Sequence, residues 1–188
     1  SPQIIRDLFV FLINIMIQLR AKNLYMTDLK PENILYCEQS GQLVFKLCDY
    51  GSFIELPNKS ISDSETFPIK PAMSYHINNS PNYYLNTYPG FEITNIDELE
   101  KMILFHIGLS ILDVYYFLYL PEKKINLFYD RLRIDSCKEV CKDKNKKKKQ
   151  CIHCLRTKLK VHLDHLDRGE HSNNEPLDKI ILFIYNNL

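Results

Sequence analysis

The sequence predicts a mainly α-helical domain that has a small β-hairpin and is built around a buried central helix. Apolar residues recur at helical spacing near the N-terminus, a second apolar stretch has the length of a core helix, and two short β-type runs flank a glycine-containing link. A chain of 188 residues is long enough for one domain with a substantial core. Its net charge of +1 gives no global field that would attract nucleic acid or an acidic membrane surface.

The first half of the chain predicts a helix, a loop and a hairpin. A helix is expected over residues 3–20, where the apolar positions follow the helical period, and a polar loop is expected over residues 22–33. The runs Ile34–Cys37 and Leu43–Cys48 are expected to pair as a hairpin, because Gly41 in the link between them supplies the freedom that a turn needs.

The second half predicts an irregular segment followed by helices. Prolines break any period over residues 52–95, and a long helix is expected from about residue 97 to residue 120, just before Pro121. Further helical segments are expected at residues 124–134, 155–166 and 176–188.

The apolar stretch Met102–Leu120 has nearly the length of a membrane span. We expect a buried helix and no membrane partner, because His106 and Asp113 interrupt the stretch and ionisable groups are costly inside a bilayer. The first apolar run follows charged residues and lacks a small-residue cleavage site, so it does not read as a secretory signal. An intracellular location, cytoplasmic or nuclear, is therefore expected.

Four polar residues carry the predicted chemistry. Asp28, Lys30 and Asn33 share the loop after the first helix, and the hairpin should return Asp49 to a place beside Asn33. Two oxygen ligands that converge in this way suit Mg²⁺ carrying substrate phosphates. An acid that orients a hydroxyl and a cation that offsets phosphate charge are what in-line phosphoryl transfer needs.

These residues resemble motifs of eukaryotic-type protein kinases. The string Asp-Leu-Lys-Pro-Glu-Asn over residues 28–33 resembles the catalytic loop of that family, and Asp49-Tyr50-Gly51 resembles its metal-binding Asp-Phe-Gly triplet. Asp-Glu-Leu-Glu over residues 97–100 is similar to the start of the central helix in the casein kinase group. Tyr50 is similar to the tyrosine of vaccinia-related kinases within that group.

The resemblance implies that residues 1–188 form a kinase-like C-terminal lobe. Its implied parts are a catalytic loop at 26–33, a metal-binding triplet at 49–51, an activation segment at about 52–95, a central helix at about 97–120 and a Cys/Lys-rich insertion at about 137–154. The chain contains no glycine-rich phosphate loop and no strand lysine paired with a helix glutamate, so the N-terminal lobe of the family is expected to be absent from it.

The resemblance also implies a role for each residue. Asp28 would be the catalytic base, and Lys30 would contact the γ-phosphate of ATP, as in serine/threonine kinases. Asn33 and Asp49 would hold Mg²⁺. Asp97 would anchor the backbone of the catalytic loop from below, and its plainer alternative role is a helix N-cap.

The chain departs from the family pattern in two places. Met26 and Thr27 stand where the family usually has His-Arg, so a phosphate on the activation segment would lose its usual partner. The Ala-Pro-Glu triplet that should close the activation segment is not recognisable. The sequence therefore does not indicate the substrate.

A cysteine cluster follows the central helix. Because no export signal is recognised, its thiols are expected to be reduced or to bind metal. The spacing Cys137-x3-Cys141-x9-Cys151-x2-Cys154 would suit a Zn²⁺ site, and the alternative is a set of reduced cysteines on an insertion. The lysine run at 142–149 is interpreted as a solvated loop rather than a nucleic-acid surface, because no aromatic residues interleave with it.

Three functions follow from these patterns. The first is a divergent serine/threonine protein kinase, present here as a fragment of a larger enzyme, that uses ATP and Mg²⁺ on a protein substrate. The second is a truncated kinase mimic or pseudokinase that binds and regulates a partner kinase. The third is a zinc-dependent nucleic-acid-binding module built on residues 137–166.

Overall fold

The computed structural model describes residues 2–56, 96–119, 137, 148–167 and 175–187. Within these ranges the helices are α1 (Pro2–Arg20), α3 (Ile96–Tyr119), α6 (Lys148–Asp167) and α7 (Glu175–Asn186). The strands are β1 (Leu24–Met26), β2 (Ile34–Gln39), β3 (Gln42–Leu47) and β4 (Phe53–Glu55). Two 3₁₀ turns, η1 (Pro31–Asn33) and η2 (Tyr50–Ser52), lie beside the hairpin strands. This mainly helical composition with small sheets agrees with the prediction, while the kinase-lobe fold itself stays a prediction.

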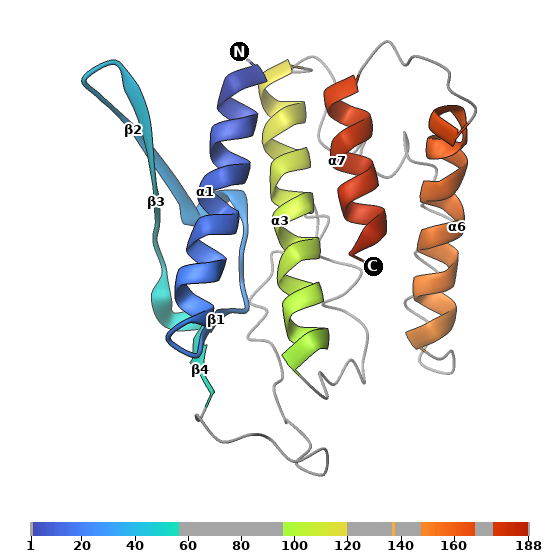
Figure 1. Ribbon diagram of the computed structural model, residues 1–188, viewed down its shortest axis with the longest axis horizontal. Coiled ribbons are helices and arrows are strands. Elements are labelled where there is room, and N and C mark those ends of the chain that lie inside the picture. The colour runs from blue at the N-terminus through green and yellow to red at the C-terminus, as the bar shows by residue number, and fades with distance from the viewer. Residues whose placement is uncertain (1, 57–95, 120–136, 138–147, 168–174, 188) are drawn as a thin grey trace.

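Helix α3 forms the centre of the described structure. It lies between α1 and α7 and runs antiparallel to both, and α6 packs on the outer side of α7 (Figure 1). Leu99, Ile103, Ile107 and Leu112 on α3 are almost completely buried. By length and composition Leu99–Tyr119 could cross a membrane. However, 67% of its apolar stretch is buried inside the protein, as expected of a core helix.

The hairpin forms as predicted, with a shorter turn. Strands β2 and β3 pair antiparallel from Ile34↔Leu47 to Gln39↔Gln42. Only Ser40 and Gly41 remain in the turn, and both have positive φ angles, 51° and 76°. Two consecutive residues with positive φ are typical of the tight turn that matches strand twist.

A second two-stranded sheet was not predicted. Strand β1 pairs antiparallel with β4, with Met26 opposite Phe53, inside segments that were expected to be irregular. Strands of three residues are too short to show a period of two in the sequence. This sheet brings the chain that follows the hairpin back to the loop that precedes it.

Helix boundaries differ from the prediction mainly at α6. That helix begins at Lys148, seven residues before the expected start, because the lysines and glutamine at its start are good helix formers. Residues 148–154 are therefore helical rather than part of an insertion loop. The helical segment expected at 124–134, and residues 57–95 of the expected activation segment, lie outside the described residues.

Candidate active site

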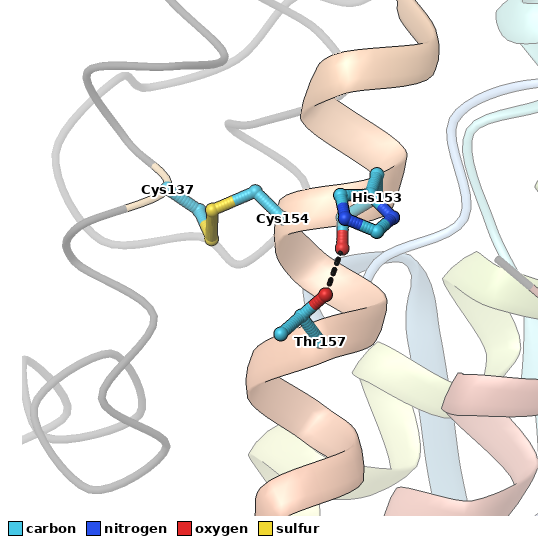
Figure 2. Close-up of a disulfide and its surroundings, with 4 residues drawn as sticks. All are labelled: Cys137, His153, Cys154 and Thr157. Carbon is cyan, nitrogen blue, oxygen red and sulfur yellow. Dashed lines mark hydrogen bonds between the residues drawn. A yellow bond between two sulfur atoms is a disulfide. The ribbon is translucent and has the colours of Figure 1, made fainter.

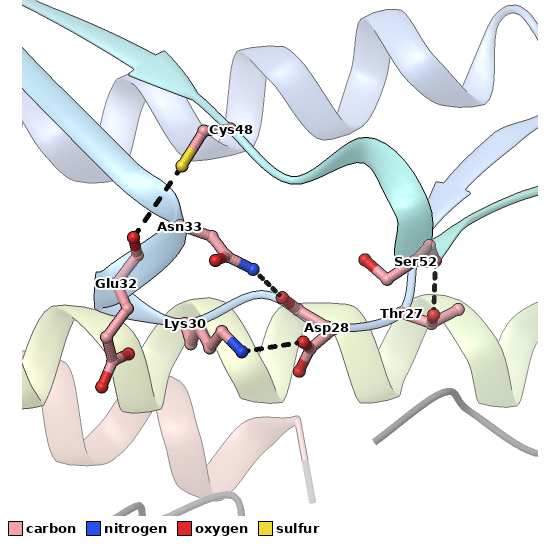
Figure 3. A network of polar contacts seen from close by, with 7 residues as sticks. All are labelled: Thr27, Asp28, Lys30, Glu32, Asn33, Cys48 and Ser52. Atoms are coloured by element: carbon pink, nitrogen blue, oxygen red, sulfur yellow. Dashed lines mark hydrogen bonds and ion pairs between the residues drawn. The ribbon is translucent and has the colours of Figure 1, made fainter. Parts of the chain in front are cut away.

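The loop between β1 and β2 brings together three of the predicted site residues. Asp28 is buried, and its carboxylate Oδ2 lies 3.0 Å from the Nζ of Lys30. The side-chain Nδ2 of Asn33 donates a hydrogen bond of 3.0 Å to the backbone carbonyl of Asp28. Figure 3 shows both contacts converging on Asp28. The loop is therefore fixed by its own polar side chains.

Burial dominates the electrostatics of Asp28. It raises the pKa of the carboxyl above its ordinary value, and the hydrogen bond and positive charge of Lys30 oppose that rise. The charges of Asp49 and Glu32 raise the pKa of Asp28 further. The Asp49 carboxylate therefore lies close enough to Asp28 for the two charges to interact.

Two hydrogen bonds hold the segment that contains Asp49 against this loop. On one side the backbone N–H of Cys48 donates to the carbonyl of Asn33 at 2.9 Å. On the other side the hydroxyl of Thr27 donates to the carbonyl of Ser52 at 2.6 Å (Figure 3). Asp49 lies between these two tethers. As the hairpin geometry predicts, the chain returns to Asn33 immediately before Asp49.

Asp49 has a left-handed backbone conformation, with φ 60° and ψ 71°. Residues other than glycine adopt this conformation uncommonly, although Asp and Asn do so more readily than most, and Asn23 and Ser40 also have positive φ angles. The tethers at Cys48 and Ser52 hold the backbone on both sides of Asp49. The fold therefore fixes the orientation of Asp49.

The donor set suits a hard divalent cation. Because the nitrogen of the Asn33 amide is held by Asp28, its oxygen is left for another partner. This oxygen and the carboxylate of Asp49 are oxygen donors of the type that Mg²⁺ prefers, and Mg²⁺ keeps water and phosphate oxygens as its other ligands. The residues present thus fit a magnesium-phosphate group.

Tyr50, in the second position of the triplet, is 65% exposed. Its hydroxyl donates a hydrogen bond of 2.9 Å to the carbonyl of Leu47, and its ring meets the ring of Phe53 edge to face, with a centroid distance of 5.2 Å. A phenylalanine at this position could not make the hydrogen bond. The tyrosine therefore adds a contact between the end of β3 and the turn that follows it.

Asp97 does not join this site. It lies in the first turn of α3 with an exposed side chain, and within the described part of the chain it makes no hydrogen bond to the loop of residues 26–33. The anchoring role implied by the resemblance is thus not visible here. The next acidic residue with a described partner is Glu100, whose Oε1 lies 2.7 Å from the Nε of Arg20. That ion pair joins α3 to the end of α1.

Two of the four cysteines of the predicted zinc site are bonded to each other. Cys137 and Cys154 are joined by a disulfide (Figure 2), so the expectation of reduced thiols is wrong for this pair. Sulfurs that are bonded to each other are not thiolates and do not supply zinc ligands. Cys141 lies outside the described residues, and Cys151 lies on α6 without a described side chain. Nowhere in the described ranges do three His, Cys, Asp or Glu side chains form a group that could hold a metal ion.

Sequence reasoning missed the positioning residues around the site. Thr27 was read only as a departure from the family pattern, but it is 1% exposed and its hydroxyl holds Ser52. A buried polar residue directly before Asp28 needs a hydrogen-bond partner, and no sequence pattern identifies Ser52 as that partner. Asp113 on α3 was also unassigned; burial and the charge of Glu32 raise the pKa of its carboxyl to about 8.

Comparison with known proteins gives a limited link to kinases. The chain is 52% identical over 33 residues to a probable serine/threonine-protein kinase, pXi, of Dictyostelium discoideum. That match covers 18% of this chain and 5% of the Dictyostelium protein, so the chain spans a small part of that relative. No protein-family model matches the chain. No solved structure matches it either.

Proposed function

We propose that this chain is the catalytic-loop side of a divergent serine/threonine protein kinase, with a kinase-like C-terminal lobe. The observation that carries the proposal is the placement of Asp28, Lys30 and Asn33 on one loop, with the segment of Asp49 tethered beside it. The short match to a probable serine/threonine kinase supports the same class. ATP would supply the phosphoryl group, and a protein hydroxyl would accept it.

Each residue has a role that its surroundings allow. Asp28 would accept a hydrogen bond from the acceptor hydroxyl and orient it, since one carboxylate oxygen is held by Lys30. Lys30 would offset the charge of the transferred phosphate. The oxygens of Asn33 and Asp49 would hold Mg²⁺, which neutralises phosphate charge when bound. Thr27 would act as a positioning residue through Ser52.

Phosphoryl transfer by the full-length protein to a generic protein substrate tests the proposal. We expect Asp28→Asn and Asp49→Asn to lower the rate by at least about 100-fold, because both remove a charge needed in the transition state. Glu38→Gln is the matched control, because Glu38 is exposed on β2 and the change is equally isosteric. Equal rates in all four proteins would refute the catalytic assignment.

A second candidate is a kinase mimic that binds and regulates a partner kinase. The observation that favours it is the exposure of Tyr36 on β2, whose side chain is 74% exposed. Tyrosine is enriched at protein interfaces, because its ring gives a large apolar contact and its hydroxyl a polar one. If Asp28→Asn leaves a cellular function intact while Tyr36→Ser abolishes it, the binding function is favoured over the enzyme.

A further inference from the structure

A cavity of about 520 Å³ lies between α1, α3 and α7, and neither the active site nor the proposed kinase function uses it. The first half of α1, the second half of α3 and the first half of α7 meet at the same end of the helix layer (Figure 1). Cavities that hold small organic ligands have volumes of roughly 300–1,000 Å³. This one has the right size for a single small molecule.

The interior of the cavity is apolar. Its walls are formed mainly by aromatic and aliphatic side chains, among them Phe9, Ile111, Tyr115, Ile180 and Phe183. Gly108 also lines it, and the absence of a side chain there lets Ile184 and Phe183 approach α3 closely. An apolar chain or ring would be removed from water on entering this space, which is favourable.

The polar groups that line the cavity favour an anion. Two cations, Arg6 of α1 and Lys179 of α7, belong to the lining, and none of the described lining residues is acidic. Arg6 is exposed and forms no ion pair with another described residue. The hydroxyl oxygen of Tyr119 is buried without a hydrogen-bond partner in the described part of the chain. A buried hydroxyl of this kind is normally satisfied, so it provides a second polar contact for a ligand.

We propose that this cavity binds a small amphipathic anion, of the class of medium-chain carboxylates. The alkyl chain fills the space between α1, α3 and α7, and the carboxylate pairs with Arg6 at the opening. Charge complementarity distinguishes this ligand from a neutral lipid or an amphipathic cation. The proposal is independent of kinase activity, because it uses none of the residues of the active site.

Calorimetric titration of the full chain with octanoate, decanoate and dodecanoate, below their micellar concentrations, tests whether the alkyl chain fills the apolar cavity. Each added CH₂ should tighten binding by up to about fourfold until the cavity is full. Methyl decanoate and decyltrimethylammonium are the neutral and cationic controls of similar chain length. The carboxylate should bind tightest. No binding, no dependence on chain length, or equal binding of the neutral ester would overturn the proposal.

Three variants test the role of Arg6. Arg6→Gln should weaken decanoate binding by about fivefold and leave methyl decanoate unchanged, and Arg6→Lys should restore most of the loss. Lys22→Gln removes an equal charge from an exposed position beyond the other end of α1, and it should have no effect. Arg6→Gln behaving like Lys22→Gln would remove the anion site.

A bulky substitution tests whether the ligand occupies the cavity itself. Ile180→Trp should abolish binding of both decanoate and its ester, with folding checked by circular dichroism. If that variant does not fold, the chain-length series on the unmodified protein decides instead. Sedimentation of the protein without ligand tests whether a second copy of the chain covers this cavity. A dimer that dissociates on Ile180→Trp but not on adding decanoate would show such a covering copy and would overturn the proposal.

Discussion

At the residue scale, the buried ionisable groups fall into those that have a partner and those that have none. Asp28 has Lys30, which offsets part of the cost of burying its carboxylate. His106 on α3 is 2% exposed, and neither of its ring nitrogens has a hydrogen-bond partner in the described structure. The buried charge of Asp28 is thus partly compensated, whereas the unpartnered His106 makes the stability of the fold depend on pH.

His106 should make the protein less stable in acid. Burial alone lowers its pKa from 6.5 to about 4. The unfolded chain therefore binds a proton near pH 6.5 and the folded chain only near pH 4, so stability that is fully present above pH 6.5 is lost as the pH falls to about 4. The loss is on the order of 3 kcal/mol. Urea unfolding of the wild type and His106→Leu between pH 4 and pH 8 measures it.

The quantity to compare is the difference in free energy of unfolding between the wild type and His106→Leu at each pH. The pKa of Asp28 and that of Asp113 are both raised in the folded state, so these groups stabilise it at low pH and the stability they add is lost as the pH rises. Their contribution is shared by wild type and variant and cancels in the difference. His153→Gln, at an exposed position on α6, should reproduce the wild-type profile. A flat difference between wild type and His106→Leu would contradict the argument.

At the scale of elements, one glycine sets how closely α3 approaches α7. A Cβ atom at Gly108 would lie 2.6 Å from Cγ1 of Ile184 and 3.1 Å from Cδ1 of Phe183. We therefore expect Gly108→Ala to destabilise the fold by about 1–2 kcal/mol, because overpacking outweighs the gain in helix propensity of about 1 kcal/mol. Thermal unfolding of Gly108→Ala measures this cost.

A double variant separates steric overlap from other causes. Ile184→Ala removes the atom that the new Cβ would meet, so Gly108→Ala should cost less in that background than alone. Strict additivity of the two substitutions would show that the contact between α3 and α7 does not explain the effect.

The elements that sequence reasoning located share a strong period or a turn signal. The helices α1 and α3 and the hairpin were predicted closely, because their apolar residues repeat at fixed intervals and Gly41 allows the turn. Strands β1 and β4 were missed, since three residues carry no period and their pairing joins segments far apart in the chain. The site motifs were readable for a related reason: Asp28, Lys30 and Asn33 are local in sequence. The tether from Thr27 to Ser52 is long-range and was not readable.

At the scale of the whole molecule, α6 is the least integrated of the described helices. It packs mainly on α7, which in turn packs on α3, and it presents the buried residues Leu155, Leu159 and Leu163. The disulfide from Cys154 on α6 to the fully buried Cys137 adds a covalent link at this margin. Sequence spacing could not distinguish this disulfide from a zinc site, because both need cysteines that are close together.

Reducing the disulfide should therefore loosen α6 before the rest of the fold. Closing a loop between residues separated by 17 positions stabilises a fold by about 3 kcal/mol in the chain-entropy treatment. We expect dithiothreitol to lower the free energy of unfolding of the wild type by about 3 kcal/mol. The stability of the double variant, Cys137→Ser with Cys154→Ser, should not change on adding dithiothreitol. Hydrogen exchange should rise first in α6. If Zn²⁺ restores the stability of the reduced protein but not that of the double variant, Cys137 and Cys154 also bind metal when they are reduced.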